Sequence, residues 1–428
     1  MQAFDAVVVG AGPAGLSAAA ELSRSGSVLL IERGLPTSSR RRDVPEQVLS
    51  GGGGGAGLFS DGKHSFFPSA TALWTLPDRG ALSAAFVATS ELLGRHGVQS
   101  GPLPAMTAMP ATAAMPATAA TTDSIAAGAW HEKHYPAHYV PFVERERCIE
   151  ALWCQATDHR LGARVRAAVR DGSSIVLDIE GGEGGEGGES GEAQEQIRTG
   201  ALVVVTGRWS PRWVRPWLVA LGASYTFRRV EFGVRLEAEA SANLFARLPG
   251  VDGKLRFVDI DGTELRTFCT CRQGEVVLGR SDGMAAFSGH ADGPRSGRSS
   301  VGLLVRSTSP SLAAELDRCG AAAPETLSLQ SWLRGGAQRL GSIFGERSAE
   351  LLWRGLHHLL GWAPSLVDDD VVVHAPCIEG VGDYPVDDGS LQVAPGVWIA
   401  GDAGGRFRGI VASMISGRYA ALQIKKPR

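Results

Sequence analysis

The sequence predicts an α/β fold in which a discontinuous Rossmann-like domain carries an inserted α+β domain. Three short apolar runs, at residues 4–9, 201–205 and 397–400, have strand character, and each leads directly into a turn that contains glycine. Strands of a doubly wound sheet bring their ends to a common crevice, where such folds bind ligands. We therefore expect these three distant runs to converge on one ligand.

The first run opens the domain. Its strand leads into a Gly-x-Gly-x-x-Gly turn and a helix over residues 16–22. In such a turn the first glycine permits the bend, the second lets the backbone approach a pyrophosphate, and the third lets helix and strand pack closely, so that the helix dipole points at the phosphates. The motif alone is weak, since glycine turns also serve packing. The residues expected at a dinucleotide are Gly10, Gly12, Pro13, Ala14 and Gly15.

An acidic residue ends the next apolar run. Residues 28–31 are followed by Glu32, seventeen positions after the last motif glycine, where a carboxylate can accept both hydroxyls of an adenosine ribose. NADP would need an arginine for its 2′-phosphate, and Arg33 beside an acid does not make such a site, so FAD or NAD is favoured. We still place Arg33 at the cofactor, with Arg42 from the basic run 40–42, for which a solvated loop is an equally good interpretation.

The C-terminal run decides between FAD and NAD. A short strand ends in Gly401-Asp402, and a helix that starts near Gly409 follows. This resembles flavoproteins of the glutathione-reductase-like type, which implies that Asp402 binds a ribityl hydroxyl and that the N–H groups of Ile410 and Val411 face the N1/C2 edge of the flavin. Reduced flavin gathers negative charge at N1, which a helix N-terminus stabilises. We expect noncovalently bound FAD, the alternative being an ordinary strand–turn–helix with a surface Asp402.

A longer motif resembles one particular family. Residues 53–63, Gly-Gly-Gly-Ala-Gly-Leu-Phe-Ser-Asp-Gly-Lys, look like the Gly-Gly-Ala-Gly-Thr-Phe-Ser-Asp-Gly-Lys signature of a bacterial family of FAD-utilising dehydrogenases. The resemblance implies that this loop passes the flavin, with Gly57, Ser60 and, at another strand end, Gly207 near the cofactor. The chain departs from the family at Leu58, where threonine is usual, and over residues 101–134. Further matches follow in the family's order at residues 207–208, 230–237, 266–271, 274–276, 383–385 and 401–417.

Composition and charge fit a two-domain enzyme. The chain has 428 residues, 44% of them hydrophobic, enough for more than one core. Its net charge of −3 argues against a nucleic-acid or anionic-membrane surface. No apolar run approaches the roughly 18 to 20 residues of a membrane-spanning helix, and Asp5 interrupts any signal peptide. We expect a cytoplasmic protein whose partners are a small-molecule substrate and a diffusible electron donor such as NAD(P)H, with no nucleic acid and no membrane.

Six cysteines in a chain of this length do not form a disulfide framework, and in a reducing compartment they should be thiols. Cys269 and Cys271 are close in sequence, and alternate residues of a strand point the same way. Three interpretations stay open: buried structural thiols, thiols beside the flavin or substrate, and a redox-active disulfide, which a Cys-x-Cys loop would strain. No metal site is expected, because two cysteines without a second pair do not make a zinc site and Pro136 breaks the helix that would align the histidines around it.

Domain boundaries follow from these anchors. The FAD domain should comprise residues 1–75, 135–210 and 372–428, with 76–134 as an insertion and 211–371 as a substrate domain. Two low-complexity stretches cannot bury enough apolar area to order their backbone, and the second is expected at the tip of a hairpin. These stretches are residues 106–122 and 181–194; strands are expected near 230–237, 255–260, 267–271 and 276–278, and helices over 144–159, 309–319 and 327–344.

Together these features predict an FAD-dependent oxidoreductase that transfers a hydride or electrons at flavin N5 on a small organic substrate, by dehydrogenation or its reverse. A flavin monooxygenase or oxidase and a noncatalytic FAD-stabilised scaffold are the alternatives; the chain lacks the Pro-x-x-Gly-Gln-Gly run of aromatic hydroxylases. The candidate proton donors are Lys63 and His64, which follow the glycine loop, and Tyr384, in the Asp-Tyr-Pro segment. A structural role suits each of the three equally well.

Overall fold

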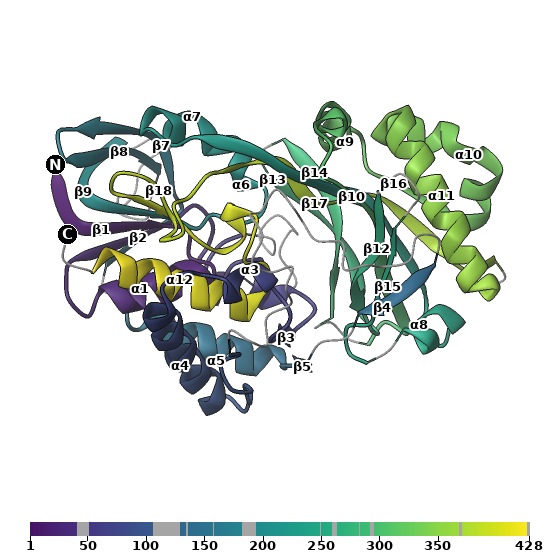
Figure 1. Ribbon diagram of the computed structural model, residues 1–428, viewed down its shortest axis with the longest axis horizontal. Helices are drawn as coiled ribbons and strands as arrows, with labels where there is room; N and C mark the ends of the chain where they lie inside the picture. Colours follow the sequence, from purple (N-terminus) through teal and green to yellow (C-terminus); the bar gives the residue numbers. More distant parts are fainter. Residues whose placement is uncertain are drawn as a thin grey trace.

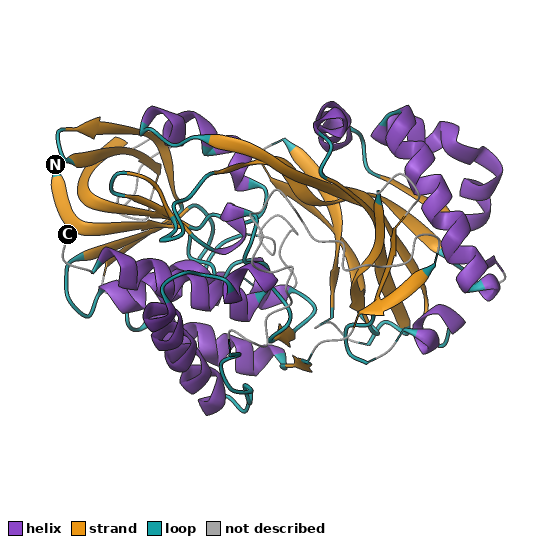
Figure 2. Ribbon diagram, viewed as in Figure 1, coloured by secondary structure: helices purple, strands orange, loops and turns teal. Residues whose placement is uncertain are grey.

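The protein is described from a computed structural model in which two domains lie side by side along the longest axis (Figures 1 and 2). We call them the parallel-sheet domain and the antiparallel-sheet domain after their main sheets. The chain passes between them in the long strand β10, Tyr225–Glu239, which starts against the core of the first domain and ends in the core of the second. The described residues are 1–40, 51–105, 129–133, 136–156, 158–181, 194–248, 250–258, 263–281, 283–291, 295–367 and 370–425.

The parallel-sheet domain is built on strands in the order β18-β19-β9-β1-β2-β6, in which all neighbours but β18 and β19 are parallel. Side chains alternate between two cores: Val8 and Leu30 face helices α1 and α12, whereas Val7 and Leu29 face α7 and the hairpin β7–β8. Strands buried on both faces are apolar throughout, which is why the sequence reveals them as continuous runs. The bounds are β1 (Gln2–Val9), β2 (Val28–Glu32), β6 (Asp158–Leu161), β7 (Ala163–Asp171), β8 (Ser174–Gly181), β9 (Gln194–Val204), β18 (Gln392–Ala394), β19 (Val397–Ile399), α1 (Pro13–Leu22), α3 (Thr71–Trp74), α4 (Arg79–Arg95), α5 (Phe142–Trp153), α6 (Ser210–Trp213), α7 (Arg215–Ala220) and α12 (Ile410–Ile424), with a small sheet of β3 (Lys63–Ser65) and β5 (Ala137–Tyr139).

The antiparallel-sheet domain is built on seven strands in the order β16-β17-β10-β15-β12-β11-β4. Helices α10 and α11 cover one face, on the right in Figure 1. The bounds are β4 (Trp130–Lys133), β11 (Lys254–Val258), β12 (Glu264–Cys271), β15 (Arg298–Ser307), β16 (Glu325–Ser328), β17 (Val372–Pro385), α8 (Asn243–Arg247), α9 (Ala313–Ala321), α10 (Leu329–Phe344), α11 (Glu346–Trp362) and the hairpin β13 (Glu275–Ser281) and β14 (Met284–His290).

Strand β10 illustrates that the antiparallel sheet has one apolar face and one polar face. Phe232 and Val234 lie in the core beneath α10 and α11, and by alternation Glu231 and Arg235 lie on the opposite face. Arginine and glutamate side chains of β12, β15 and β17 join them there through ion pairs. We call this the polar face of the antiparallel sheet.

The structure differs from the expected boundaries and elements in five places. Residues 215–220, expected in the substrate domain, form α7, which packs in the core of the parallel-sheet domain. Residues 372–385 form β17, which pairs with β10 and so belongs to the second sheet. The expected insertion 76–134 contributes to both domains: α4 packs on α12 of the parallel-sheet domain, whereas β4 joins the second sheet. The helix expected over 144–159 ends at Trp153, since residues 158–161 pair with β2 as an edge strand. The helix expected from 309 begins at Ala313, after a short 3₁₀ turn.

The remaining fold predictions hold where the structure describes them. The α/β class, with a Rossmann-like parallel sheet and a second domain, is confirmed. Strands β8 and β9 form the expected antiparallel hairpin around the glycine- and glutamate-rich stretch, whereas residues 106–122 lie outside the described residues. Among the described helices, none is long and apolar enough to cross a membrane.

Candidate active site

The turn after β1 is shaped by close backbone contacts. Gly10 has φ +110°, and a Cβ there would lie 2.7 Å from the carbonyl oxygen of Val205, at the end of β9. A Cβ on Gly15 would lie 1.8 Å from the Gly10 oxygen. These two positions therefore require glycine so that α1 can start directly at the strand ends.

Glu32 ends β2 beside this turn. Its side chain is buried, and its two oxygens accept the N–H groups of Ala11 at 2.8 Å and Gly34 at 2.9 Å. An ionised carboxylate has about four acceptor positions, so the group can accept further donors. This is where the sequence places the carboxylate that binds a ribose.

The basic residues near this turn differ from those named from the sequence. Arg33 points toward the second domain, where it donates to Ser281 at 2.5 Å, and Arg42 lies outside the described residues. Arg40 instead is buried at the glycine loop, donating to the carbonyl oxygen of Gly55 at 3.1 Å, and burial lowers its pKa to about 10. The basic run of the sequence indicated this loop but not which arginine enters it.

The loop of residues 52–57 lies between the first turn and the C-terminal helix. Gly54 donates its N–H to the carbonyl of Ala11 at 2.8 Å, and a Cβ on Gly55 would lie 2.9 Å from Gly12 Cα. A Cβ on Gly57 would lie 3.0 Å from Ile410 Cγ1, at the start of α12. The Ser60 hydroxyl closes this loop on itself by donating to the Gly57 carbonyl at 2.9 Å.

The third turn leads from β19 into α12. Gly401 lies against Ala14, and a Cβ on the glycine would lie 3.0 Å from the alanine Cβ. Gly409 has φ +102° and caps α12, and a Cβ built on it meets no described atom within 4 Å. The first N–H groups of a helix, here those of Ile410 and Val411, have no carbonyl of the helix to bind. The end of this turn therefore presents helix N–H groups next to open space.

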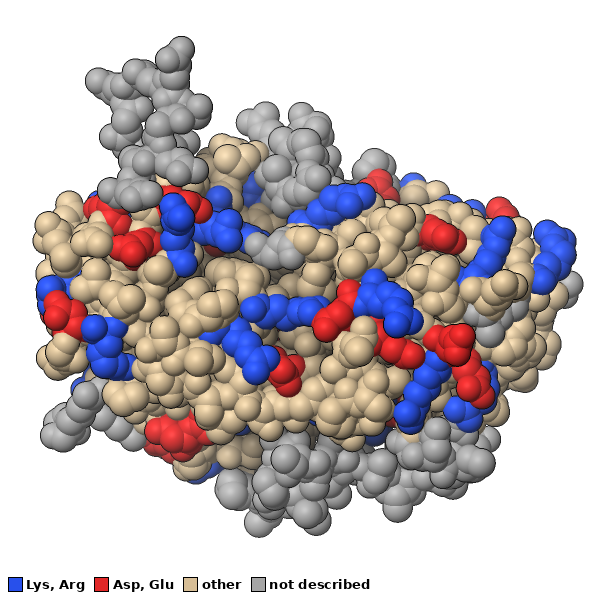
Figure 3. All heavy atoms as spheres, turned by 90° about the horizontal axis from the view of Figure 1, so that it is seen from above, with Lys and Arg blue, Asp and Glu red and all other residues tan. Residues whose placement is uncertain are grey.

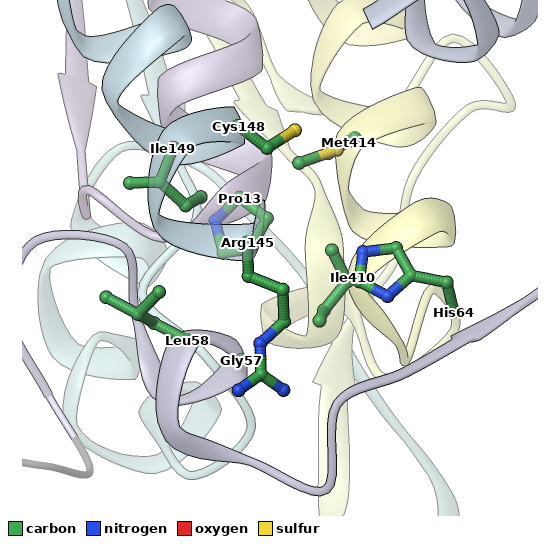
Figure 4. A pocket seen from close by; sticks show the side chains of 9 residues that line it. All are labelled: Pro13, Gly57, Leu58, His64, Arg145, Cys148, Ile149, Ile410 and Met414. Atoms are coloured by element: carbon green, nitrogen blue, oxygen red, sulfur yellow. The ribbon is translucent and has the colours of Figure 1, made fainter. Parts of the chain in front are cut away.

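A small apolar cavity marks the place where the three turns meet. It is lined by residues of the first turn, the glycine loop, α5 and α12 (Figure 4). Cys148 and Met414 face each other across it, and Arg145 extends between Leu58 and Ile410. Gly207, at the end of β9, has φ +90° with no described atom within 4 Å of a Cβ. Distant parts of the chain thus form one concave glycine-lined region, as the sequence predicts.

A network of six arginines and four carboxylates runs from this region along the polar face. Its centre is Glu231, 1% exposed, which lies 3.2 to 3.5 Å from four guanidinium groups. Arg408 connects the network to the α12 turn, because it also pairs with Asp402 at 2.8 Å. Burial alone would raise the pKa of Glu231, but the arginines, Arg266 foremost, hold it well below its ordinary value. The members are Arg208, Arg229, Arg256, Arg266, Arg306, Arg408, Glu231, Glu264, Glu379 and Asp402.

One aromatic ring stands among these cations. Phe268 is half-buried on β12, and the charged ends of Arg266, Arg408 and Lys254 lie 5.0, 5.6 and 5.1 Å from its ring centroid. Farther out, basic and acidic side chains alternate across the face seen from above (Figure 3). The sequence did not indicate this network, because its members are far apart in the chain.

Lys63, a candidate proton donor, is held as an ammonium group. Its Nζ lies 2.8 Å from both Asp61 and Asp252, the second of which belongs to the antiparallel-sheet domain. Burial disfavours the charge, but the carboxylates, Asp61 first, raise the pKa of Lys63 well above its ordinary value. The residue therefore joins the two domains as an ion pair and gives up its proton poorly at neutral pH.

The other two candidates are buried in different settings. His64 lines the cavity and contacts the Gly62 carbonyl at 3.4 Å, and burial lowers its pKa to about 4, so the ring is neutral at pH 7. The Tyr384 oxygen accepts the N–H of Val381 at 3.0 Å within β17, and burial raises its pKa. His64 thus lies at the cavity, whereas the Tyr384 ring packs against the third turn, where a Cβ on Gly405 would lie 2.5 Å from it.

One segment of the chain matches a family model, and several solved structures are distantly similar to the whole chain. Residues 5–58 match the family model described as FAD binding domain. Among solved structures, AlpK is 16% identical with a TM-score of 0.43, covering 99% of this chain and 63% of its own. A variant of NikD, described as an unusual amino acid oxidase essential for nikkomycin biosynthesis, is 15% identical with a TM-score of 0.46, covering 100% and 94%, and glycine oxidase from Geobacillus kaustophilus is 14% identical with a TM-score of 0.43, covering 99% and 95%. No curated protein matched the chain.

The matched segment contains β1, the first turn, α1, β2 with Glu32, and the glycine loop. Two features of this segment suit FAD: a backbone turn that a Cβ would fill and a buried carboxylate beside it. The N-terminus of α12, outside the matched segment, adds helix N–H groups near the glycine loop. The protein binds FAD, and residues 5–58 of its parallel-sheet domain are similar to an FAD binding domain.

Proposed function

We propose that the protein transfers a hydride or electrons at flavin N5 to or from a small anionic organic substrate, which lies between the flavin and the polar face. The observation that carries this proposal is the arginine network, in which four guanidinium groups surround the buried Glu231 beside Phe268. A diffusible reductant such as NAD(P)H, or a diffusible oxidant if the substrate is the electron donor, completes the turnover.

The chain's own residues would bind FAD in three places. The first turn, with Gly10, Gly12 and the start of α1, suits the pyrophosphate, and Glu32 suits the adenosine ribose. The α12 N-terminus, capped by Gly409, suits the flavin edge that becomes negative on reduction. FAD supplies the redox chemistry when bound, and the protein supplies position and electric field.

Anion recognition follows from the charges around Phe268. Arg408 already contacts Glu231, Glu379 and Asp402. Arg266 is bound to Glu231 through Nη2, but its buried Nε has no hydrogen-bond partner among the described residues, so this guanidinium can donate to a further anionic group. The half-buried ring offers an apolar surface between them, suited to the carbon skeleton of a small acid. Arginine binds carboxylate and phosphate groups through paired hydrogen bonds.

The proposal is tested by anaerobic reduction of the bound flavin. Purified protein should be yellow and release FAD intact on heating or acidification. Among small hydroxy acids, amino acids and their neutral amides, the acids alone should reduce the flavin, and Arg266→Gln should weaken that reaction at least tenfold. The surface variant Arg164→Gln serves as control, since Arg164 is an exposed residue of β7 that pairs with Glu180 of β8 at 4.0 Å. Failure to bind FAD, or equal reduction by acids and amides, would refute the proposal; oxygen uptake during turnover would assign it to the oxidases.

A further inference from the structure

Two cysteine thiols lie close together at the interface between the two domains. The Sγ atoms of Cys269 and Cys271 lie 3.8 Å apart at the end of β12. Residues two apart in a regular strand are separated by about 6.6 Å along its axis, near the upper limit of Cα separation for a disulfide. Here Cys269 has φ +51°, within an irregularity of the β12–β15 pairing, and the chain turns so that both sulfurs come together.

The two thiols differ in their surroundings. Cys269 is half-buried and donates to Asp61 at 2.8 Å, whereas Cys271 is buried. A Cβ built on Gly289 would lie 2.0 Å from Arg235 Nη2 and 2.5 Å from Cys271 Sγ, so the guanidinium and this sulfur converge over the glycine. The contact between the two sulfurs, followed by Arg235, lowers the pKa of Cys271, and the same contact raises the pKa of Cys269. Cys271 is thus the more acidic of the two thiols and the one placed to attack as a thiolate.

A metal ion is the competing occupant of this cluster. The ligand atoms of Asp61, Cys269 and Cys271 lie within 4.8 Å of one another, which is compact enough for one ion. The Lys63 ammonium lies 2.8 Å from Asp61, and Arg235 donates to the Cys269 carbonyl at 2.8 Å. Two fixed cations repel a third and stabilise a thiolate, so the charges favour thiol chemistry over metal binding.

We propose that Cys269 and Cys271 form a reversible disulfide that exchanges two electrons with the FAD. Asp61 connects the pair to the flavin side, because it follows the loop whose Gly57 packs against the start of α12. In the oxidative direction the Cys271 thiolate attacks the Cys269 sulfur as the S–H proton leaves toward Asp61. The S–S bond forms, oxidised flavin takes both electrons and that one proton, and the charge of −1 passes from the thiolate to the reduced flavin. The electron exchange rests on the proposed FAD function, whereas formation of the disulfide does not.

The disulfide is tested by trapping thiols in the full-length protein. Protein equilibrated in glutathione buffers is quenched with an alkylating reagent and its peptides are weighed. The peptide that holds both cysteines should pass from two alkyl groups to an internal disulfide that is lighter by two hydrogens than the dithiol, and exposed Cys154 should remain alkylated throughout. Two alkylated cysteines in every buffer, or only mixed disulfides with glutathione, would overturn the inference. So would stoichiometric zinc retained after dialysis of the wild type and lost in Cys271→Ser.

Exchange with the flavin is tested spectroscopically under anaerobic conditions. Dithiothreitol should reduce the bound FAD at least tenfold faster in the wild type than in Cys271→Ser, whereas dithionite should reduce both alike. Cys154→Ser is the matched control and should behave as the wild type does. A reduced dithiol beside oxidised flavin should also give long-wavelength charge-transfer absorbance that Cys271→Ser lacks. Equal rates in all three proteins would refute the exchange while the FAD function stood, and absence of FAD would refute that function while the trapping result remained readable.

Discussion

The two domains build binding surfaces by different means. In the parallel-sheet domain the surface is backbone: turns approach one another so closely that a Cβ on Gly10 or Gly15 would fall within 3 Å of a carbonyl oxygen. In the antiparallel-sheet domain the surface is side chains, with four arginines around the buried Glu231. A backbone surface of this kind can be built by any chain, whereas the charged surface depends on side chains particular to this one. Under the proposed function, the first surface would bind the cofactor and the second would select the substrate.

The largest effect should follow from breaking the charged surface. Glu231→Gln removes the anion that four buried guanidinium groups share and leaves them to repel one another, so we expect a loss of about 3–5 kcal/mol in unfolding free energy. Glu180→Gln is the control, because Glu180 also faces two arginines but on the surface, and should cost less than about 1 kcal/mol. Denaturant titration measures both. Equal losses would mean that the network contributes no more than surface ion pairs do.

The second-largest effect should follow from a side chain added where two helices of the parallel-sheet domain are in backbone contact. A Cβ on Gly417 in α12 would lie 2.0 Å from the carbonyl oxygen of Ala14 in α1, so Gly417→Ala should separate these helices and cost about 1–3 kcal/mol in unfolding free energy, with loss of FAD affinity. Gly341→Ala in α10 is the control: no described atom lies within 4 Å of its Cβ, and the change should raise unfolding free energy by up to about 1 kcal/mol. A Gly417→Ala protein as stable as the wild type would show that the helices can adjust.

This contrast explains what could be predicted from the sequence. The first turn and the capping of α12 were predictable, because positive φ at Gly10 and Gly409 leaves few residue choices and the strands beside them are continuous apolar runs. Strand β17 was not predicted, since its partner β10 is distant in sequence. Helix α11 was not predicted either, although Gly345 precedes it and it packs on the neighbouring helix α10.

The ion pairs of the polar face could not be predicted from the sequence for a related reason. Arg266, Arg306 and Glu379 meet Glu231 or its arginines only after β10, β12, β15 and β17 are paired in register. No spacing of residues within one segment of the chain predicts these ion pairs. The cysteine pair was found as a pair from its spacing, but its neighbours Asp61 and Arg235 come from other strands and loops.

The adenosine end of the cofactor site offers a smaller and more specific test. If the Glu32 carboxylate holds the ribose through charge-assisted hydrogen bonds, Glu32→Ala should cost roughly 1.5–3 kcal/mol of FAD affinity, about ten- to a hundredfold. Asp5→Ala is the control, since Asp5 binds the backbone of Ser27 at 2.8 Å at the opposite end of the same two strands. Titration of both apoproteins with FAD should show weakened binding for Glu32→Ala only. Equal affinities would place the ribose elsewhere.

The smallest effect should appear at the flavin edge, where backbone and charge act together. Gly409 and Gly222 share φ +102°, and a Cβ on either would have no described atom within 4 Å, so alanine at either position should cause similar strain of about 1–2 kcal/mol. Gly409 alone caps α12, however, and a side chain there should hold the N–H groups of Ile410 and Val411 away from the flavin N1/C2 edge. Since about 30 mV of a two-electron couple corresponds to 1.4 kcal/mol, Gly409→Ala should lower the flavin midpoint by tens of millivolts, whereas Gly222→Ala should leave it unchanged. Potentiometric titration of fully flavinated proteins decides: a wild-type midpoint in Gly409→Ala would mean that this helix does not face the ring, and the substrate site placed beside it would have to move.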